Sequence, residues 1–359
     1  MSSQIRYFLG SNSPAGFFSL YDDFADSLSD GTLCVLKGGP GCGKSTCMRR
    51  IAERLEDAGV RSERIYCSGD PDSLDAVYFP DLRLAYADGT APHVLEPRYP
   101  GAAGRYLDLS AFYDAGALSP LRHEIAALNA AYKERYRRAY ALTEAADDAV
   151  RSLYEPLQTE RVVSRVRARA RGFAARELRA AAPGRAEKRF LGALTCRGRL
   201  TFFDTVRALA DRVCVLDGEY GLAAVFLDEI FSGLQRKGAA CVVCPDDQRP
   251  ARLGHILIPS LSLALVTQTK RAPYTGERFR HIRLDAAAGP VEAEQKRAFR
   301  ACTRLSDDLE REAISVLAEA KALHDDLERV YNPHVDFAGV LALADRQADA
   351  ALEKRASVL

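Results

Sequence analysis

The chain has 359 residues, of which 47% are hydrophobic and 28% charged, and its formal net charge is +1. This length allows two domains, and the composition is that of an ordinary globular protein rather than a disordered or fibrous one. The nearly neutral charge excludes a global electrostatic attraction to nucleic acid or to membranes.

The sequence carries no recognisable targeting or membrane signal. The N-terminal residues Met-Ser-Ser-Gln-Ile-Arg contain no apolar signal core. The longest apolar candidate, Ile256 to Val266, is interrupted by Pro259 and falls short of the roughly 20 residues that span a bilayer. We therefore expect a cytoplasmic protein without a membrane partner.

Residues 33–46 read as a strand, a glycine-rich loop and the start of a helix. The run Gly38–Ser45 fits the phosphate-binding spacing Gly-x4-Gly-Lys-Ser/Thr. Glycines let successive backbone N–H groups point at a phosphate, and the following helix adds the positive end of its dipole. The alternative, a glycine-rich turn without a ligand, leaves the combination of strand, Lys-Ser pair and helix unexplained.

Each part of this loop has an expected role in holding a nucleotide. Lys44 would reach the β- and γ-phosphates, and Ser45 would hold Mg²⁺. The residues expected to bind the nucleotide are Gly39, Pro40, Gly41, Cys42, Gly43, Lys44, Ser45 and Thr46.

An apolar run from Leu82 ends in an acid at Asp88, the pattern of a Walker B strand. An aspartate there would position Mg²⁺ through its water shell. We therefore predict Lys44 and Asp88 as catalytic residues, and Ser45 and Asp88 as the Mg²⁺ site. The alternative for Asp88 is a solvated loop aspartate.

Asp70, Asp72 and Asp75 follow the preceding predicted strand, near the sheet edge where α/β proteins bind ligands. Asp70 is the weaker metal candidate. The alternative is a turn whose aspartates cap backbone N–H groups. His93 and Arg98 are further candidates for the phosphate side of the site.

Two stretches rich in Ala, Leu, Glu and Arg, residues 118–182 and 291–356, have helical spacing and predict helical hairpins. The first of them overlaps the strongly basic stretch Arg161–Arg189, which could bind nucleic acid or form an arginine-bearing lid over the nucleotide. The alternative is a solvated helix with arginine stems along its flanks.

The second half of the chain repeats the first. Arg6-Tyr-Phe-Leu-Gly10 returns as Arg189-Phe-Leu-Gly192, and Phe79-Pro-Asp-Leu-Arg-Leu84 returns as Ile258-Pro-Ser-Leu-Ser-Leu263. Even the helical tails share a pattern, Tyr154-Glu-Pro156 and Tyr331-Asn-Pro333. An offset of about 180 residues indicates a duplicated domain rather than a solenoid.

The break Pro183-Gly184 precedes the second copy, so we divide the chain into residues 1–184 and 185–359. Alternating strands and helices in each copy predict an α/β fold with a parallel sheet. The expected architecture is thus a duplicated parallel-sheet fold in which each copy carries a long helical hairpin.

In the second copy the phosphate-loop position reads Asp217-Gly-Glu-Tyr-Gly-Leu-Ala-Ala-Val225. The glycines thin out, no lysine follows, and Asp217 and Glu219 place negative charge where phosphates would lie. We predict that this loop binds no nucleotide and that the second copy is a structural or regulatory partner of the first.

The run Ala224-Val-Phe-Leu-Asp-Glu229 also resembles a Walker B strand. The repeat instead places it in the helix after the degenerate loop, where Phe226, Ile230 and Leu234 fall on one face. We favour the helix over the strand.

The loop Gly38–Thr46 resembles those of P-loop NTPases, especially nucleotide kinases and AAA-type ATPases. The duplicated layout looks like an uncharacterised bacterial family of tandem P-loop ATPases. The matching features are Tyr7-Phe-Leu-Gly10, the loop, Cys67-Ser-Gly-Asp70, Asp88-Gly-Thr-Ala-Pro-His93 and the second copy. The resemblance implies a P-loop NTPase fold and ATP binding. Such a family would have a usable second loop, and this chain departs from that pattern.

These observations predict a Mg²⁺-dependent, ATP-binding NTPase with one site, in the first half, that hydrolyses ATP. The first alternative is a nucleotide or small-molecule kinase, which needs a phosphoryl acceptor. The second is an ATP-sensing scaffold or a nucleic-acid-binding protein that uses Arg161–Arg189. An unidentified protein partner stays open in each case. A GTPase is disfavoured because the chain has no Asn-Lys-x-Asp motif.

Overall fold

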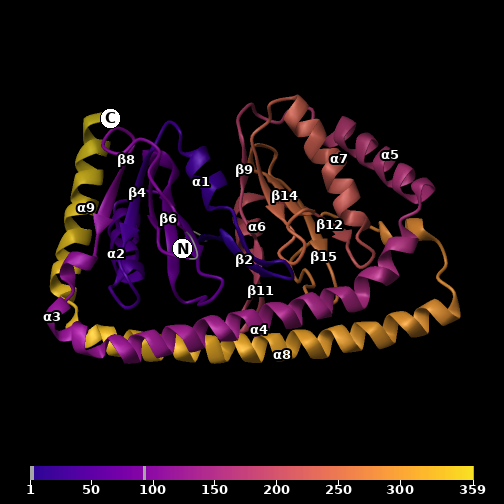
Figure 1. The fold of residues 1–359 in the computed structure, drawn as a ribbon. Coiled ribbons are helices and arrows are strands. Elements are labelled where there is room, and N and C mark those ends of the chain that lie inside the picture. The colour runs from indigo at the N-terminus through magenta and orange to yellow at the C-terminus, as the bar shows by residue number, and fades with distance from the viewer. Residues whose placement is uncertain (1–3, 92–93, 359) are drawn as a thin grey trace. The chain divides into compact units, whose positions relative to one another are not determined.

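The computed structural model describes residues 4–91 and 94–358, which form two compact units (Figure 1). We call residues 4–10, 19–138 and 315–358 the N-sheet unit, and residues 11–18 and 139–314 the C-sheet unit. Each unit contains a six-stranded sheet. The two long helices α4 (Arg122–Tyr154) and α8 (Ala293–Tyr331) each contribute residues to both units.

The sheet of the N-sheet unit has the strand order β1-β5-β6-β7-β4-β8. Its strands are β1 (Ile5–Phe8), β4 (Thr32–Lys37), β5 (Glu63–Tyr66), β6 (Leu74–Phe79), β7 (Leu84–Asp88) and β8 (Gly104–Asp108). The predicted α/β class is confirmed, but the prediction of a parallel sheet is wrong in one strand, because β6 runs antiparallel to both neighbours. The connections into and out of β6 are too short for the crossover that parallel pairing requires.

The sheet of the C-sheet unit repeats this topology, with the order β16-β12-β15-β14-β13-β9 and β14 as its antiparallel strand. Its strands are β9 (Ala186–Lys188), β12 (Arg212–Asp217), β13 (Cys241–Pro245), β14 (Leu253–Ile258), β15 (Leu263–Gln268) and β16 (Arg280–Ile282). The match extends to the backbone. Among the described residues, the two non-glycine residues with positive φ are Arg83 and Ser262, each at 48° after an equivalent 3-10 turn.

Smaller elements complete each unit. Two short hairpins are formed by β2 (Gly10–Ser13) with β3 (Gly16–Ser19), and by β10 (Gly192–Thr195) with β11 (Gly198–Thr201). The short helices are α1 (Tyr21–Ser27), α3 (Ala115–Leu118) and α6 (Phe203–Leu209). No helix among the described residues is long and apolar enough to cross a membrane.

An equivalent helix follows the second strand from one edge of each sheet: α2 (Lys44–Asp57) follows β4, and α7 (Leu222–Arg236) follows β12. Both are amphipathic and bury one face in the core of their unit. In α7 the buried face includes Phe226, Ile230 and Leu234, all 0% exposed. The predicted helix is therefore confirmed, and the strand reading of residues 224–229 is wrong.

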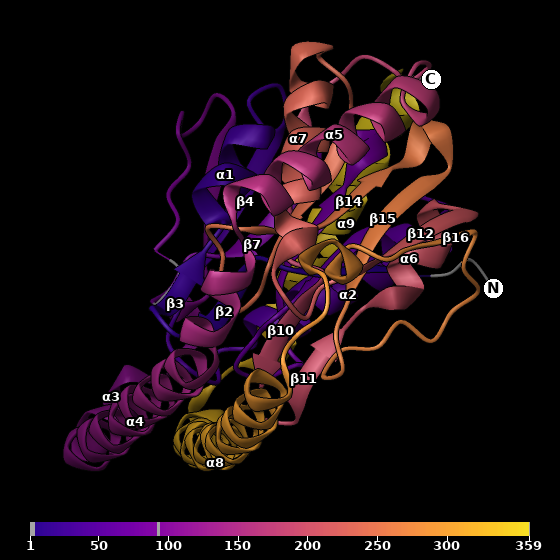
Figure 2. The same cartoon turned by 90° about the vertical axis from the view of Figure 1, so that its right-hand side faces the viewer.

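The predicted helical stretches are present, but they do not form hairpins. The shorter helix of each pair, α5 (Glu160–Glu177) or α9 (Phe337–Val358), packs on a sheet-covering helix instead: α5 on α7, and α9 on α2 (Figure 1). Figure 2 shows α5 beside α7 in a second view. The cause is the apolar stripe of each shorter helix, which for α5 consists of Val162, Val166, Ala170 and Phe173.

The shorter helices are thereby exchanged between the two predicted halves of the chain. The strands of the two sheets follow the division at residue 184, since β1–β8 precede it and β9–β16 follow it. However, α5 belongs to the C-sheet unit and α9 to the N-sheet unit. Residues Pro183 and Gly184 lie between α5 and β9, within the C-sheet unit.

Candidate functional site

The loop between β4 and α2 has the backbone geometry that its glycines make possible. Gly41 (φ 69°) and Gly43 (φ 82°) are left-handed, and Gly43 stands immediately before the first residue of α2. Other side chains adopt this conformation only at a cost, so the sequence pattern and the loop shape agree. The loop ends where the N–H groups of the first turn of α2 have no helical partner, which favours an anion there.

Lys44 folds back over this loop. Its Nζ donates hydrogen bonds to the carbonyl oxygens of Gly38 (2.7 Å) and Gly39 (2.9 Å), and it lies 3.6 Å from Oδ2 of Asp88. The two side chains are 12% and 15% exposed. The structure thus brings together the two residues that the sequence singled out as catalytic.

Asp88 reaches Lys44 because β7 pairs with β4, with Asp88 opposite Leu36. Burial raises the pKa of Asp88, while Lys44 and hydrogen bonds from Thr90 act in the opposite direction. The Thr90 hydroxyl and N–H donate to Oδ1 at 2.6 and 2.8 Å. These contacts leave Asp88 fixed at a strand end rather than solvated in a loop.

Ser45 and Thr46 lie in the first turn of α2. The hydroxyl oxygen of Ser45 accepts a hydrogen bond from the N–H of Leu74 at 2.9 Å, at the start of β6. Thr46 is exposed. A serine hydroxyl and a carboxylate are oxygen ligands of the type that Mg²⁺ prefers.

The three acids after β5 have different surroundings. Asp70 lies in a turn, accepts a hydrogen bond from the Ser73 hydroxyl at 2.9 Å and lies 3.4 Å from Nζ of Lys321. Asp72 is an exposed residue of the same turn. The alternative of a turn with hydrogen-bonding aspartates therefore describes Asp70, and its charge is already compensated by a lysine.

Asp75, in contrast, is buried on β6 with 5% exposure and accepts a hydrogen bond from the Tyr21 hydroxyl at 2.8 Å. Burial raises the pKa of Asp75 to about 6. Sequence reasoning grouped it with the turn. The signal that could have separated it is its place inside the apolar run Leu74–Phe79.

The junction between α8 and α9 covers part of the loop and was missed from the sequence. The Asn332 amide, oriented to satisfy both of its partners, donates to the carbonyl oxygens of Gly41 (3.1 Å) and Glu328 (3.2 Å). A Cβ on Gly43 would lie 3.3 Å from Val340 and 3.4 Å from Phe337. The shared Tyr-x-Pro pattern of the two helical tails was the available signal.

A tyrosine holds the other side of the loop. The Tyr113 hydroxyl donates to the carbonyl oxygen of Pro40 at 2.8 Å, and the Tyr113 ring lies 5.3 Å from that of Tyr331. The loop is therefore in contact with both the segment after β8 and the end of α8.

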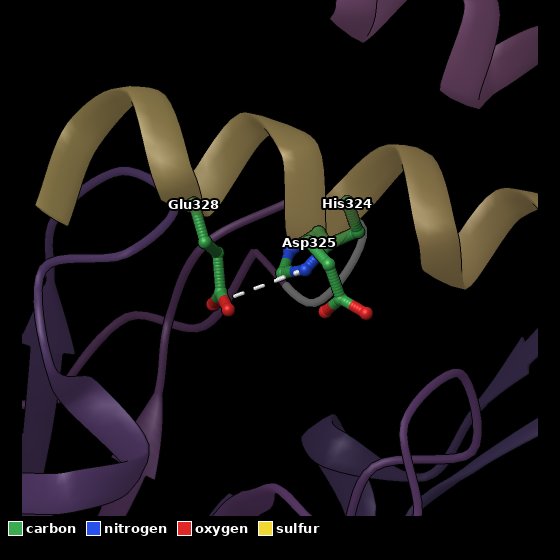
Figure 3. A group of neighbouring side chains, drawn as sticks. All are labelled: His324, Asp325 and Glu328. Atoms are coloured by element: carbon green, nitrogen blue, oxygen red, sulfur yellow. Dashed lines mark ion pairs between the residues drawn. The ribbon is translucent and has the colours of Figure 1, made fainter.

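One cluster on α8 has the composition of a metal site: His324, Asp325 and Glu328, whose ligand atoms lie within 4.8 Å of one another (Figure 3). His324 Nδ1 is 3.8 Å from Glu328. However, the ammonium group of Lys321 contacts Asp325 directly. A divalent ion would have to displace that cation, so we assign no metal to the cluster.

The equivalent loop of the C-sheet unit, Gly218–Gly221, is contacted by a carboxylate from a later segment of the chain. The N–H groups of Glu219 and Tyr220 donate to the Asp285 carboxylate at 3.1 and 3.3 Å. Burial raises the pKa of Asp285 to about 6. Leu222, the first residue of α7, stands where Lys44 stands in α2.

The remaining candidates lie away from this arrangement. Arg98 pairs with Asp26, and His93 lies outside the described residues. The basic stretch Arg161–Arg189 belongs to the C-sheet unit, where α5 buries its apolar stripe and exposes most of its arginines. Arg189 is the exception, since it is fully buried and pairs with Glu187 at 3.1 Å.

Comparisons of the chain with protein-family models, with curated proteins and with solved structures gave no match.

Proposed function

We propose that the N-sheet unit binds Mg-ATP at the loop 38–46 and hydrolyses it. The observation that carries the proposal is the position of Lys44, held between the loop carbonyls and Asp88 on the neighbouring strand. In this proposal the Lys44 side chain leaves the carbonyl oxygens and contacts a phosphate when the nucleotide binds.

The proposed roles follow from the chemistry of phosphoryl transfer. The loop N–H groups and Lys44 stabilise negative charge on the transferred phosphoryl group. Ser45 and Asp88 would hold Mg²⁺ through their oxygen atoms, and the ion would neutralise charge on the phosphates. Lys44 would exchange its contact with Asp88 for contacts with phosphate, which frees the carboxylate for its role toward the metal.

The C-sheet loop supports a single nucleotide site per chain in this proposal. Asp285 already occupies the N–H groups of Glu219 and Tyr220. A phosphate would have to displace it against the repulsion of Glu219 and Asp217. The absence of a lysine at Leu222 removes the compensating charge.

The α8–α9 junction provides a means of reporting nucleotide state. Asn332 contacts Gly41, and Phe337 lies next to Gly43. A change in loop conformation on phosphate binding would therefore alter the contacts of the loop with α8 and α9. Order and contact changes of this kind are a recurrent basis of nucleotide-dependent switching.

The test is ATP turnover by the full chain with Mg²⁺ and without an added acceptor. We expect turnover, with a fall of about a hundredfold or more in Lys44→Ala and in Asp88→Asn. Lys296→Ala, which changes an exposed lysine outside the site, is the matched control and should retain full turnover.

Two outcomes contradict hydrolysis at this site. Turnover that persists in Lys44→Ala would place the activity elsewhere. ATP consumption that appears only when a hydroxylated acceptor is added would replace the hydrolase proposal with the kinase alternative.

A further inference from the structure

The C-sheet unit contains a cavity of about 440 Å³ next to its degenerate loop. Gly218, at the end of β12, and Thr267, near the end of β15, both line it. This is the sheet edge that corresponds to the Lys44–Asp88 site of the N-sheet unit. The volume falls in the range of small-molecule sites.

Most of the acidic side chains of the cavity wall pair with arginines of the same wall. Arg199, whose side chain is 12% exposed, lies between Asp247 (2.7 Å) and Glu310 (2.9 Å). The other wall acids pair with Arg249 or Arg271, or accept backbone N–H groups; these acids are Asp147, Asp307, Asp246 and Glu219. Three arginines of the wall thus pair with four of its acids, whereas Asp246 and Glu219 are held by backbone N–H groups.

Two cations of the wall are not compensated in this way. Arg252 and Lys270 both line the cavity. Among the described residues neither forms a direct ion pair with a carboxylate, although Arg252 acts on Asp228 through its charge. Arg252 lies close to the loop, since a Cβ on Gly221 would be 3.0 Å from its Nη1. An anion is the ligand that such an arrangement favours.

The wall also holds two buried polar atoms without a hydrogen-bond partner among the described residues: Nε of Arg199 and Oγ1 of Thr267. A buried polar atom without a hydrogen bond is energetically unfavourable, so a ligand that supplies a hydrogen-bond partner to either atom would be stabilised. A ligand with an oxygen acceptor could take the Arg199 N–H, and either a donor or an acceptor could pair with the Thr267 hydroxyl.

We propose that this cavity binds a small organic anion. Its carboxylate or phosphate group lies between Arg252 and Lys270, and a second polar group reaches Arg199 and Thr267. Asp285 keeps the anion out of the loop itself, so the ligand is distinct from a nucleotide held by its phosphates. The proposal does not depend on ATP binding in the N-sheet unit.

The experiment is calorimetric titration of the full chain with two probes, inorganic phosphate and citrate. It is carried out in a Lys44→Ala background, which removes the lysine of the loop 38–46 as a competing phosphate site. We expect saturable binding of at least one probe at one site, with a Kd below about 1 mM. Tighter phosphate binding identifies a phosphorylated ligand, and tighter citrate binding identifies a carboxylate.

The variants assign the binding to the cavity. Arg252→Gln with Lys270→Gln should weaken the bound probe about a hundredfold, because two charge-assisted contacts are lost. Arg278→Gln with Lys296→Gln, two exposed cations that do not line the cavity, should leave binding unchanged. Circular dichroism of each variant establishes that it is folded.

A third variant separates binding from folding. Thr267→Val removes the unpaired hydroxyl at nearly constant volume, so the ligand-free chain should unfold at a higher temperature while probe binding weakens. The proposal is overturned if neither probe binds saturably, or if both the double variant and Thr267→Val bind as tightly as their parent. Neither result depends on whether the chain hydrolyses ATP.

Discussion

Asp75 is buried and Asp88 partly buried on neighbouring strands, and loss of hydration raises the pKa of both carboxyl groups. Removing a carboxylate from water is costly unless a partner compensates it. Asp88 has Lys44 as that partner, whereas Asp75 accepts a hydrogen bond from Tyr21. Such perturbed groups occur most often at functional sites, which adds support for this sheet edge as the site.

The raised pKa of Asp75 predicts a pH-dependent loss of stability. Its pKa is about 6 in the folded chain against an ordinary 3.8, so the folded state holds its proton to higher pH than the unfolded state. The free energy of unfolding therefore falls between about pH 4 and pH 6 and then stays level. In Asp75→Asn this contribution is absent.

We expect the stability of Asp75→Asn, relative to the wild type, to rise between pH 4 and pH 6. Urea unfolding at several pH values measures the difference, and the parallel effect of Asp285 cancels because that residue is present in both proteins. A difference that is constant with pH, or that falls, would contradict the assignment.

At the scale of elements, the glycine-rich loop is held by helix α9 as well as by the sheet. Val340 is fully buried and lies next to Gly43, and Phe337 also lies next to it. Helix α9, which lies far from the loop in the sequence, therefore helps to fix the shape of the loop. Sequence reasoning about the loop and its flanking strand and helix could not include that segment.

Gly43 and Gly59 form a matched pair for testing this support. Both have positive φ, 82° and 76°, but a Cβ on Gly43 would crowd α9, whereas a Cβ on Gly59 would meet nothing within 4 Å. We expect Gly59→Ala to cost about 1 kcal/mol of stability, from backbone strain alone. Gly43→Ala should cost about 2–4 kcal/mol, because overpacking adds to the strain.

Chemical denaturation of the two variants gives both values. Equal losses would show that α9 does not confine the loop.

The exchange of α5 and α9 also explains where prediction from the sequence succeeded and failed. The spacing of Val162, Val166, Ala170 and Phe173 indicates a helix with one apolar face, and that helix is present. The spacing does not say which surface the face will cover. The hairpin prediction assumed the nearest helix in sequence, whereas α5 covers α7.

At the scale of the molecule, two sheets of identical strand order carry different loops. The repeat was visible in the sequence because the duplicated strands and turns kept their residues, such as the Pro-x-Leu turns before β7 and β15. Two separate local patterns singled out Lys44 and Asp88, which lie 3.6 Å apart in the structure. In both cases the information lies within short segments.

Contacts between distant segments could not be predicted in the same way. The hydrogen bonds of Glu219 and Tyr220 to Asp285 join segments far apart in the sequence. The cavity near Arg252 and Thr267 likewise depends on helices α4 and α8 as well as on the sheet. No local pattern of residues specifies which distant side chain will hydrogen-bond to the backbone of a loop.

The most direct test of the account is the stoichiometry of Mg-ATP binding to the full chain, measured by equilibrium dialysis. We predict one nucleotide per chain, weakened at least about a hundredfold by Lys44→Ala. Asp285→Asn, which changes the residue that contacts the loop Gly218–Gly221, should leave both the stoichiometry and the affinity unchanged. Absence of binding, two nucleotides per chain, or full binding by Lys44→Ala would contradict the assignment of the loop 38–46 as the nucleotide site.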